Sequence, residues 1–434
     1  MLDWIARKRD GGRLEPDEVR ALVEGVTRGE IPEYQAAAWL MAVYFRGMDA
    51  AETASLTDAM IRSGRSLDLS DLGAVAVDKH STGGVGDKIS LVLAPAVAAC
   101  GGKVPMISGR ALGHTGGTRD KLASSPGFDT GLSLEALKRQ VQELGFAFGA
   151  ATADLAPADR ILYRLRDATC TVESIPLITS SILSKKAAEG IGGLVLDVKT
   201  GSGAFLSDPA AARLLAESMV ATGERLGVRT VALLTDMGQP LGRAVGNALE
   251  VEEVIEALSG RGPTDVVELT LALGAEMLVL AGVADDVPAA RARLARALAD
   301  GSAKAAFRAA VERQGGDPAA VDDPARLPRA RERAEVTSPR AGVVAAIDAK
   351  AVGLASHGLG AGRATMEDAI DPAAGIVCRK KIGEAVDAGE PLVECRFADR
   401  SRFDAVEGGL RAAFVIADEA LPPTSLVLDR VARP

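Results

Sequence analysis

The sequence predicts an α/β protein with a mostly parallel main sheet, a helical N-terminal region and a small α+β region at the C-terminal end. Apolar runs of strand length alternate with helical patterns between Val75 and Leu258, which is typical of a parallel sheet. Roughly the first sixty residues carry only helical periodicity. After Pro339, short β-rich runs alternate with glycine turns.

Three helices are expected in the N-terminal region. The first follows Pro16, because apolar residues recur at helical spacing: Val19, Leu22, Val23 and Val26. The second covers residues 34–45 and is apolar nearly all round at 36–41, which suggests burial on several sides or in a subunit interface. Asp49, with Glu52 three residues later, predicts a capping box that starts the third helix.

Two glycine-rich loops, at residues 78–88 and 108–121, carry most of the chemistry. They follow expected strands at 74–77 and 104–107, with an expected helix at 89–100 between them. Because parallel strands end at the same edge of a sheet, we expect both loops to build one site. Glycines, hydroxyls, lysines and a helix N-terminus are suited to an oxyanion. The sequence therefore predicts an oxyanion site there.

The strand and helix alternation continues to residue 258. Further strands are expected at 147–151, 194–198 and 228–234, and further helices at 133–144, 208–226 and 247–258. A third glycine loop, KTGSGAF, starts at Lys199. Ser181 and Lys185 are four residues apart, so they share one helix face. A lysine at the edge of an otherwise apolar helix predicts a cationic group in a partly buried place.

Composition excludes several classes of function. The net charge of −9, with scattered basic residues, argues against a nucleic-acid partner. The four cysteines stand singly and there are only three histidines, so we expect no metal site and a reducing, cytoplasmic location. The N-terminus is unlike a signal peptide, and no apolar run reaches about eighteen residues, so we expect no membrane association.

These motifs closely resemble the thymidine and pyrimidine-nucleoside phosphorylase family over essentially the whole chain. The most specific segments begin at Lys79, Ser108, Arg166, Asp197 and Pro240, and they read KHSTGGVGDK, SGRALGHTGGTRDK, RDATCTVESIPLITSSILSKK, DVKTGSGAF and PLGRAVGNALEVEE. The resemblance implies a small helical domain that faces a large α/β domain across a cleft. It also implies a homodimer formed through the helical domain.

The expected domains follow from the resemblance together with the texture of the chain. Residues 1–66, completed by about 160–190, form the helical domain. Residues 67–159 and 191–335 form the α/β domain, and 336–434 the C-terminal α+β domain. We expect closure of the cleft, with hinges near residues 67–73, 156–162 and 189–193.

The activity implied by the resemblance is reversible phosphorolysis of pyrimidine nucleosides in pyrimidine salvage, with thymidine the first substrate and uridine a second. Inorganic phosphate is a co-substrate, and no cofactor is expected. By resemblance, the phosphate ligands are Lys79, Ser81, Ser90, Ser108 and Thr118. The pyrimidine ligands are Arg166, Ser181 and Lys185, and the catalytic set is His80, Arg166 and Lys185.

Lys88 is expected to act in place of a metal ion. Some family members bind a monovalent cation beneath the phosphate loop through small polar residues, a glutamate and backbone carbonyls. Here Lys88 stands at the polar position and Glu253 at the glutamate, with carbonyls near Leu241 and Ala244. An ammonium group could occupy the cation position and pair with Glu253.

The second loop departs from the family pattern. Arg119 replaces an apolar residue, Ala123-Ser124-Ser125 replaces a Glu-Ser-Ile or Glu-Ser-Val segment, and Ala111 replaces a glycine. None of these is an expected ligand, but they could alter loop packing and rate.

Two other functions remain open from the sequence. An anthranilate phosphoribosyltransferase-like enzyme would need carboxylates for magnesium, and it would usually lack the β-rich tail. A carrier module is suggested by the turn at residues 383–390, although Lys380 and Lys381 do not stand in a carrier motif.

Overall fold

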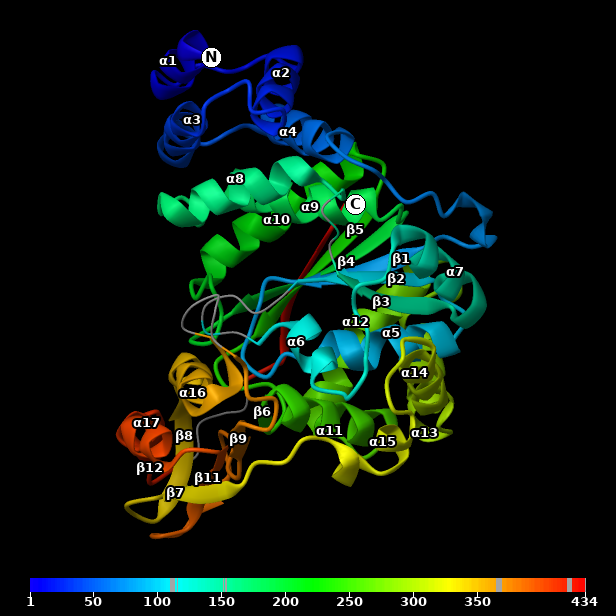
Figure 1. The fold of residues 1–434 in the computed structure, drawn as a ribbon. Helices are drawn as coiled ribbons and strands as arrows, with labels where there is room; N and C mark the ends of the chain where they lie inside the picture. Colours follow the sequence, from blue (N-terminus) through cyan, green and yellow to red (C-terminus); the bar gives the residue numbers. More distant parts are fainter. Residues whose placement is uncertain are drawn as a thin grey trace.

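A mostly parallel sheet lies at the centre of the protein (Figure 1). The computed structural model describes residues 1–109, 114, 116–150, 152, 154–363, 369–419 and 424–433. Strands β1, β4 and β5 pair in parallel, β2 pairs in parallel with β3, and a parallel bridge from Ala76 to Lys103 joins the two groups. The bounds are β1 (Val77–Ser81), β2 (Val104–Ser108), β3 (Phe146–Ala150), β4 (Gly193–Thr200) and β5 (Arg229–Asp236).

The N-terminal helices and two later helices form a separate layer above this sheet (Figure 1). They are α1 (Leu2–Arg9), α2 (Pro16–Thr27), α3 (Glu33–Arg46), α4 (Ala50–Arg62), α8 (Pro157–Ala168) and α9 (Ile175–Ala188). Their common core contains Trp39, Leu40 and Leu162. The capping box expected at Asp49 and Glu52 is present at the start of α4. Helix α10 (Pro209–Arg225) lies between this layer and the sheet, and Thr179 Oγ1 lies 2.9 Å from Ser218 Oγ.

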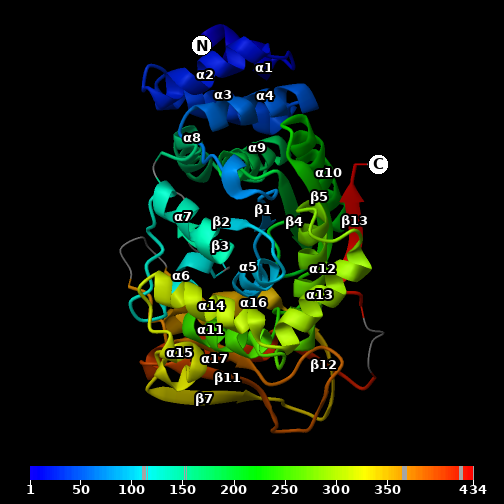
Figure 2. The ribbon, with the colours of Figure 1, turned by 90° about the vertical axis from the view of Figure 1, so that its right-hand side faces the viewer.

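Helices also cover the faces and edges of the sheet (Figure 2). They are α5 (Ile89–Ala99), α6 (Thr118–Ala123), α7 (Leu134–Leu144), α11 (Asn247–Leu258), α12 (Thr264–Leu280), α13 (Val287–Ala299), α14 (Ser302–Arg313) and α15 (Ala319–Asp322), with short 3₁₀ turns η1 (Ser70–Leu72) and η2 (Pro324–Arg326). Helix α5 is buried on nearly all sides, because its residues are almost entirely apolar. Among the described residues, no helix is long and apolar enough to cross a membrane.

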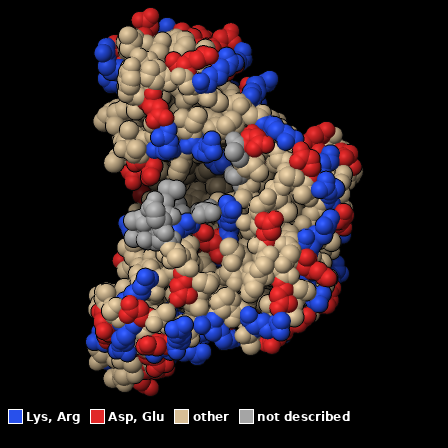
Figure 3. All heavy atoms as spheres, viewed as in Figure 1, with Lys and Arg blue, Asp and Glu red and all other residues tan. Residues whose placement is uncertain are grey.

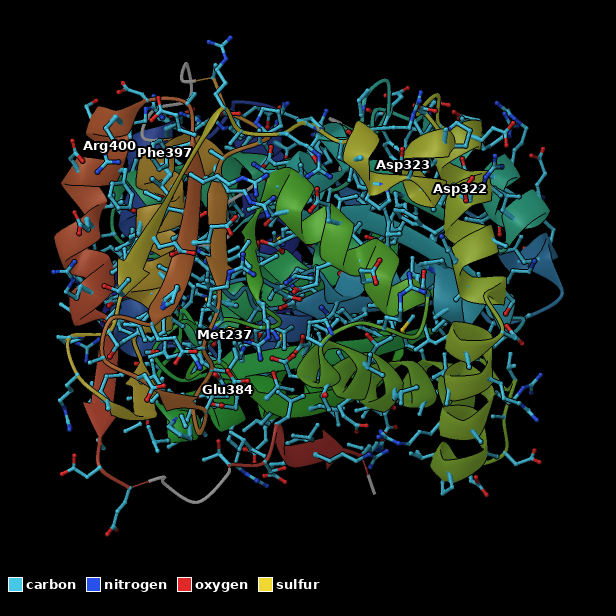
Figure 4. The ribbon with its side chains drawn as sticks, turned by 90° about the horizontal axis from the view of Figure 1, so that it is seen from below. Met237, Asp322, Asp323, Glu384, Phe397 and Arg400 are labelled. Carbon is cyan, nitrogen blue, oxygen red and sulfur yellow. The ribbon has the colours of Figure 1, made fainter. Side chains whose placement is uncertain are left out.

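Two antiparallel sheets and two longer helical segments build the C-terminal region. The first sheet has the order β6-β9-β11-β7 and the second β10-β8-β12. Phe397 stacks on Phe403 with ring centroids 5.3 Å apart, and Arg400 lies over the Phe403 ring; Phe397 and Arg400 are labelled in Figure 4. The elements are β6 (Ala244–Gly246), β7 (Glu332–Thr337), β8 (Gly342–Ile347), α16 (Ala349–Ser356), the π-helical turn η3 (His357–Ala361), β9 (Gly375–Cys378), β10 (Ala385–Val386), β11 (Pro391–Phe397), α17 (Arg400–Ala412) and β12 (Phe414–Ala417).

The predicted fold class is confirmed, but one strand lies outside its expected domain and another was not predicted. Strand β13 (Val427–Ala432), assigned from sequence to the C-terminal domain, pairs antiparallel with β5 and forms the edge of the central sheet (Figure 2). Arg430 fixes it by an ion pair to Glu276 on α12, with Nε 2.6 Å from Oε1. Strand β6, which the sequence did not predict, pairs with β9. Both contacts join segments distant in sequence, so local composition could not reveal them.

The helical layer should depend on a buried ion pair. Lys8 Nζ lies 2.8 Å from Glu52 Oε1 and Oε2, and Oε1 also accepts a hydrogen bond from the Leu14 backbone N–H. Glu52→Ala leaves a buried ammonium without its carboxylate, so we expect a loss of about 3 kcal/mol in the free energy of unfolding. Urea denaturation measures it.

The matched control is Glu24→Ala, which removes an exposed carboxylate of α2 that pairs with Arg28, the residue that follows the helix. That change should cost about 0.5 kcal/mol or less. Equal losses in the two variants would contradict the role assigned to Glu52.

Candidate active site

A cavity of about 640 Å³ lies between the helical layer and the carboxyl ends of β1 and β2. Figure 3 shows a hollow there with Lys and Arg side chains at its rim. Two chain segments form its opposite walls, β1–β2 with their loops and α8–α9. Nine of the expected site residues line it: Lys79, His80, Ser81, Ser90, Ser108, Thr118, Arg166, Ser181 and Lys185.

The first wall is suited to an oxyanion. Ser90 lies in the first turn of α5 and Thr118 is the first residue of α6, so both stand where helix N–H groups have no partner within their helix. Ser108 Oγ is buried and, among the described residues, has no hydrogen-bond partner. Lys79 Nζ is fully buried and pairs with Asp197 at 3.3 Å. Hydroxyls, helix N-termini and an ammonium group therefore face one space.

The expectation that residue 78 begins a loop is wrong. Strand β1 continues through Ser81, because Val77 to Ser81 pair in register with Gly193 to Asp197 of β4. Glycine loosens the chain only beyond that point, where Gly83 has φ of 97°. Lys79, His80 and Ser81 are therefore held by strand pairing and not by a mobile loop.

Helices α8 and α9 provide the second wall. Lys185 Nζ contacts the Ser181 carbonyl at 2.5 Å and its hydroxyl at 3.1 Å, one helical turn earlier. It also pairs with the Asp159 carboxylate on α8. These contacts hold a partly exposed ammonium group at the cavity surface.

Arg166 has backbone partners in the same wall. Its guanidinium donates to the carbonyls of Val172 at 2.5 Å and Leu177 at 3.1 Å, and Nε to that of Thr171 at 3.4 Å. Tyr163 lies beneath the guanidinium, 5.8 Å from ring centroid to Cζ. Arg166 thus fixes the α8–α9 connection as well as lining the cavity.

His80 lies on β1, in the first wall, with a neutral imidazole. Burial is the main reason that its pKa lies well below the ordinary value, and the nearby charges of Lys186, Lys185 and Lys79 act in the same direction. A neutral ring carries one N–H, so it can donate one hydrogen bond and accept another.

Sequence reasoning missed three carboxylates that hold the adjacent lysines Lys185 and Lys186. Asp159 holds Lys185, and Asp78 and Glu189 hold Lys186. Lys186 Nζ also donates to the Ile107 carbonyl at 2.8 Å, so it joins α9 to both β1 and β2. Glu189 lies only three residues after Lys186, but Asp78 and Ile107 come from β1 and β2, so the sequence could not show that Lys186 joins α9 to the sheet.

Lys88 lies under the first loop and does not line the cavity. Its Nζ donates to the carbonyls of Leu241 and Ala244, each at 2.9 Å, and pairs with Glu253. Burial opposes the charged form, but Glu253 and Glu250 outweigh it and raise the pKa of Lys88. Gly86 has φ of 71°, and a Cβ there would lie 2.5 Å from the same Leu241 oxygen.

The departures in the second loop are accommodated within the fold. Arg119 Nε donates to Thr130 Oγ1 at 2.9 Å, and the Ser124 hydroxyl donates to the Lys121 carbonyl at 2.6 Å. Ser125 is buried. Ala111 lies outside the described residues.

Comparison with solved structures adds a fold relative. A chain described as anthranilate phosphoribosyltransferase from Thermus thermophilus matches with a TM-score of 0.60 and 21% identity, over 72% of this chain and 99% of that chain. At this identity the match supports the architecture alone.

Family models match three parts of the chain. Residues 2–64 match the helical bundle domain of a glycosyl transferase family, residues 73–304 the a/b domain of the same family, and residues 343–417 the pyrimidine nucleoside phosphorylase C-terminal domain.

Curated relatives agree with these models over nearly the full length. A pyrimidine-nucleoside phosphorylase of Geobacillus stearothermophilus is 48% identical over 99% of both chains. One of Staphylococcus aureus is 48% identical over 98% of both. The chain therefore belongs to the pyrimidine-nucleoside phosphorylase family of pentosyltransferases.

Proposed function

We propose that this protein catalyses reversible phosphorolysis of pyrimidine nucleosides. A phosphate oxygen attacks C1′, the C1′–N1 bond breaks with its electron pair going to the base, and free base and α-pentose-1-phosphate result. The single observation that supports this most is one cavity with an oxyanion wall facing a cationic wall. Relatives named pyrimidine-nucleoside phosphorylase at 48% identity support the same reaction.

In this proposal the first wall holds phosphate in line with C1′. Lys79 supplies charge, and the hydroxyls of Ser81, Ser90, Ser108 and Thr118 supply hydrogen bonds. The N-terminal turns of α5 and α6 add backbone N–H groups. Fixing a dianion at the reacting carbon removes much of the entropic barrier to attack.

The second wall stabilises the leaving base. Negative charge grows on the pyrimidine ring and its carbonyl oxygens as the bond breaks. Lys185, Arg166 and Ser181 would bind the ring, and His80 would donate a hydrogen bond from its neutral imidazole. Groups that meet charge only in the transition state raise the rate and not merely the affinity.

The finer assignments belong to the same proposal. Thymidine is the proposed first substrate and uridine the second, in pyrimidine salvage. Four free cysteines fit a reducing cytoplasm. A homodimer through the helical layer is supported by exposed apolar side chains on α1 and α3: Leu2, Tyr34, Tyr44 and Phe45.

Phosphate-dependent release of free base from thymidine tests the reaction and the second wall together. Lys185→Ala should lower kcat/KM by the equivalent of about 2–4 kcal/mol, because one donor to the developing charge is lost. Steady-state assays of base release, with circular dichroism to verify folding, make the measurement.

The control is Lys350→Ala, which removes an exposed lysine of α16 and should leave the rate unchanged. If wild-type protein released no base in phosphate, the proposed reaction would be excluded. A folded Lys185→Ala variant with wild-type kinetics would exclude the proposed base site.

Domain closure should accompany the reaction, because the two proposed ligand sets lie on opposite walls. We expect the radius of gyration to fall when phosphate and nucleoside are both present. Small-angle scattering, with phosphate alone as the control, measures this change. Equal dimensions for the free protein, the protein with phosphate alone and the protein with both substrates would contradict closure.

Lys88 is proposed to replace a bound monovalent cation, since its ammonium group already contacts two carbonyls and a carboxylate. Wild-type activity should then be the same in sodium and potassium buffers of equal ionic strength. Lys88→Thr should lose activity through loosening of the first loop and regain part of it in potassium. Assays across both salts measure the rescue.

Two results would contradict this role for Lys88. One is a wild-type enzyme that is inactive in sodium and restored by potassium. The other is a folded Lys88→Thr variant with full activity in sodium alone.

A further inference from the structure

Four buried charges form a closed group at the carboxyl ends of β1 and β4. We name Lys79, Lys199, Asp87 and Asp197 the charge quartet. Asp197 Oδ2 lies 2.9 Å from Lys199 Nζ and 3.3 Å from Lys79 Nζ. Asp87 Oδ2 lies 3.8 Å from each of the two Nζ atoms. The two lysine and the Asp197 side chains are 0% exposed, and that of Asp87 is 9% exposed.

Strand register places these groups together. Ser81 of β1 is opposite Asp197 of β4, and Lys199 is opposite Thr235 of β5. Lys79, Asp197 and Lys199 therefore project from one face of the sheet, because side chains two residues apart in a strand share a face. Parallel pairing therefore places three members of the quartet, and Asp87 comes from the loop between β1 and α5.

The quartet has a front and a back. Lys79 and Asp87 line the cavity, whereas Lys199 and Asp197 lie behind them, outside the cavity lining. Lys199 is the closer of the two lysines to Asp197. Asp197 therefore pairs with both lysines, and the nearer of them, Lys199, does not face the cavity.

Lys199 and Asp87 are both held in their charged forms. Burial works against the Lys199 ammonium, but Asp197 and Asp87 outweigh it and raise its pKa. Burial likewise opposes ionisation of Asp87, but Lys199, Lys79 and Lys121 hold its pKa well below the ordinary range. The quartet thus contains two amine and two carboxyl side chains. Without Lys199, one ammonium would face two carboxylates beside the space for an incoming anion.

We propose that Lys199 is a positioning residue for the anionic co-substrate. It neutralises Asp197 from behind and so leaves the charge of Lys79 available to phosphate, without touching phosphate itself. This inference rests on the proposed function. The aliphatic stem of Lys199 also supports the first loop. A Cβ on Gly84 would lie 2.7 Å from Lys199 Cδ and 2.6 Å from Cε of Met237, which is labelled in Figure 4.

Lys199→Met tests the charge while keeping a stem of similar length. We expect KM for phosphate to rise about tenfold or more, because an unbalanced buried carboxylate both repels the anion and draws Lys79 back. KM for the nucleoside should stay within about twofold of wild type, since its proposed ligands lie on the other wall.

A second substitution separates charge from packing. Asp197→Asn removes the matching negative charge, and its side-chain oxygen can still accept the Thr235 hydroxyl, now 2.6 Å from Asp197 Oδ1. The double variant Lys199→Met/Asp197→Asn should therefore recover most of the phosphate KM lost in Lys199→Met. A purely structural role for Lys199 would give no recovery. Lys350→Met, on an exposed face, is the matched control and should behave as wild type.

Calorimetric titration of inorganic phosphate into each protein, without nucleoside, gives an independent readout. A folded Lys199→Met variant with unchanged phosphate affinity overturns the proposal, as does failure of the double variant to recover. If Lys199→Met does not fold, Asp197→Asn alone decides: its phosphate affinity should equal or exceed that of wild type, and a loss overturns the proposal. Wild-type protein that binds phosphate but releases no base would instead exclude the proposed function.

Discussion

Pairing of buried charges is the constraint on which the site depends. Lys79, Lys88, Lys121 and Lys199 are all buried near the first loop, and an unpaired buried ammonium is costly. Each contacts a carboxylate: Asp197 for two of them, Glu253 for Lys88 and Glu250 for Lys121. These contacts tie the loop to β4 and α11. The loop is rich in glycine, yet these buried ion pairs fix its geometry.

The opposite wall uses the same principle across the two layers. Helices α8 and α9 come between β3 and β4 in the chain, so the sequence leaves the sheet, joins the helical layer and returns. Lys185 stays at the cavity surface through Asp159, whereas Lys186, one residue on, reaches Asp78 and the Ile107 carbonyl at the ends of β1 and β2. Both lysines line the cavity, and Lys186 also joins α9 to the sheet, so one helix turn contributes to the cavity surface and to the contact between the layers.

The C-terminal region supports the loop from a further side. Segment 240–244 passes under Gly86. Its backbone carbonyls accept hydrogen bonds from Lys88, which precedes α5, and from Lys381 in the C-terminal region. Lys88 donates to Leu241 and Ala244, while Lys381 donates to Gly242 at 2.7 Å and pairs with Asp265 at 3.1 Å. Arg243 reaches the Arg379 carbonyl at 3.0 Å and pairs with Glu384. The last domain is therefore connected to the floor of the oxyanion wall through one short segment.

The sequence by itself determined the α/β class, the helix starts with strong caps and the meeting of two glycine loops. The physical reason is that periodicity, capping and parallel-strand geometry are local or follow from strand order. It also indicated nine of the residues that line the cavity, most of them through family motifs. Only the tertiary structure decided how far β1 extends, because pairing with Gly193 to Asp197 outweighs local composition. It likewise decided that β13 completes the central sheet and that Lys199 and Asp159 stand behind residues that line the cavity. The pairing of β13 with β5 and the ion pair of Asp159 with Lys185 join segments separated in the chain, and the Lys199–Asp197 pair meets Lys79 only because β1 pairs with β4. Burial and charge balance stabilise these contacts, and no single stretch of sequence contains them.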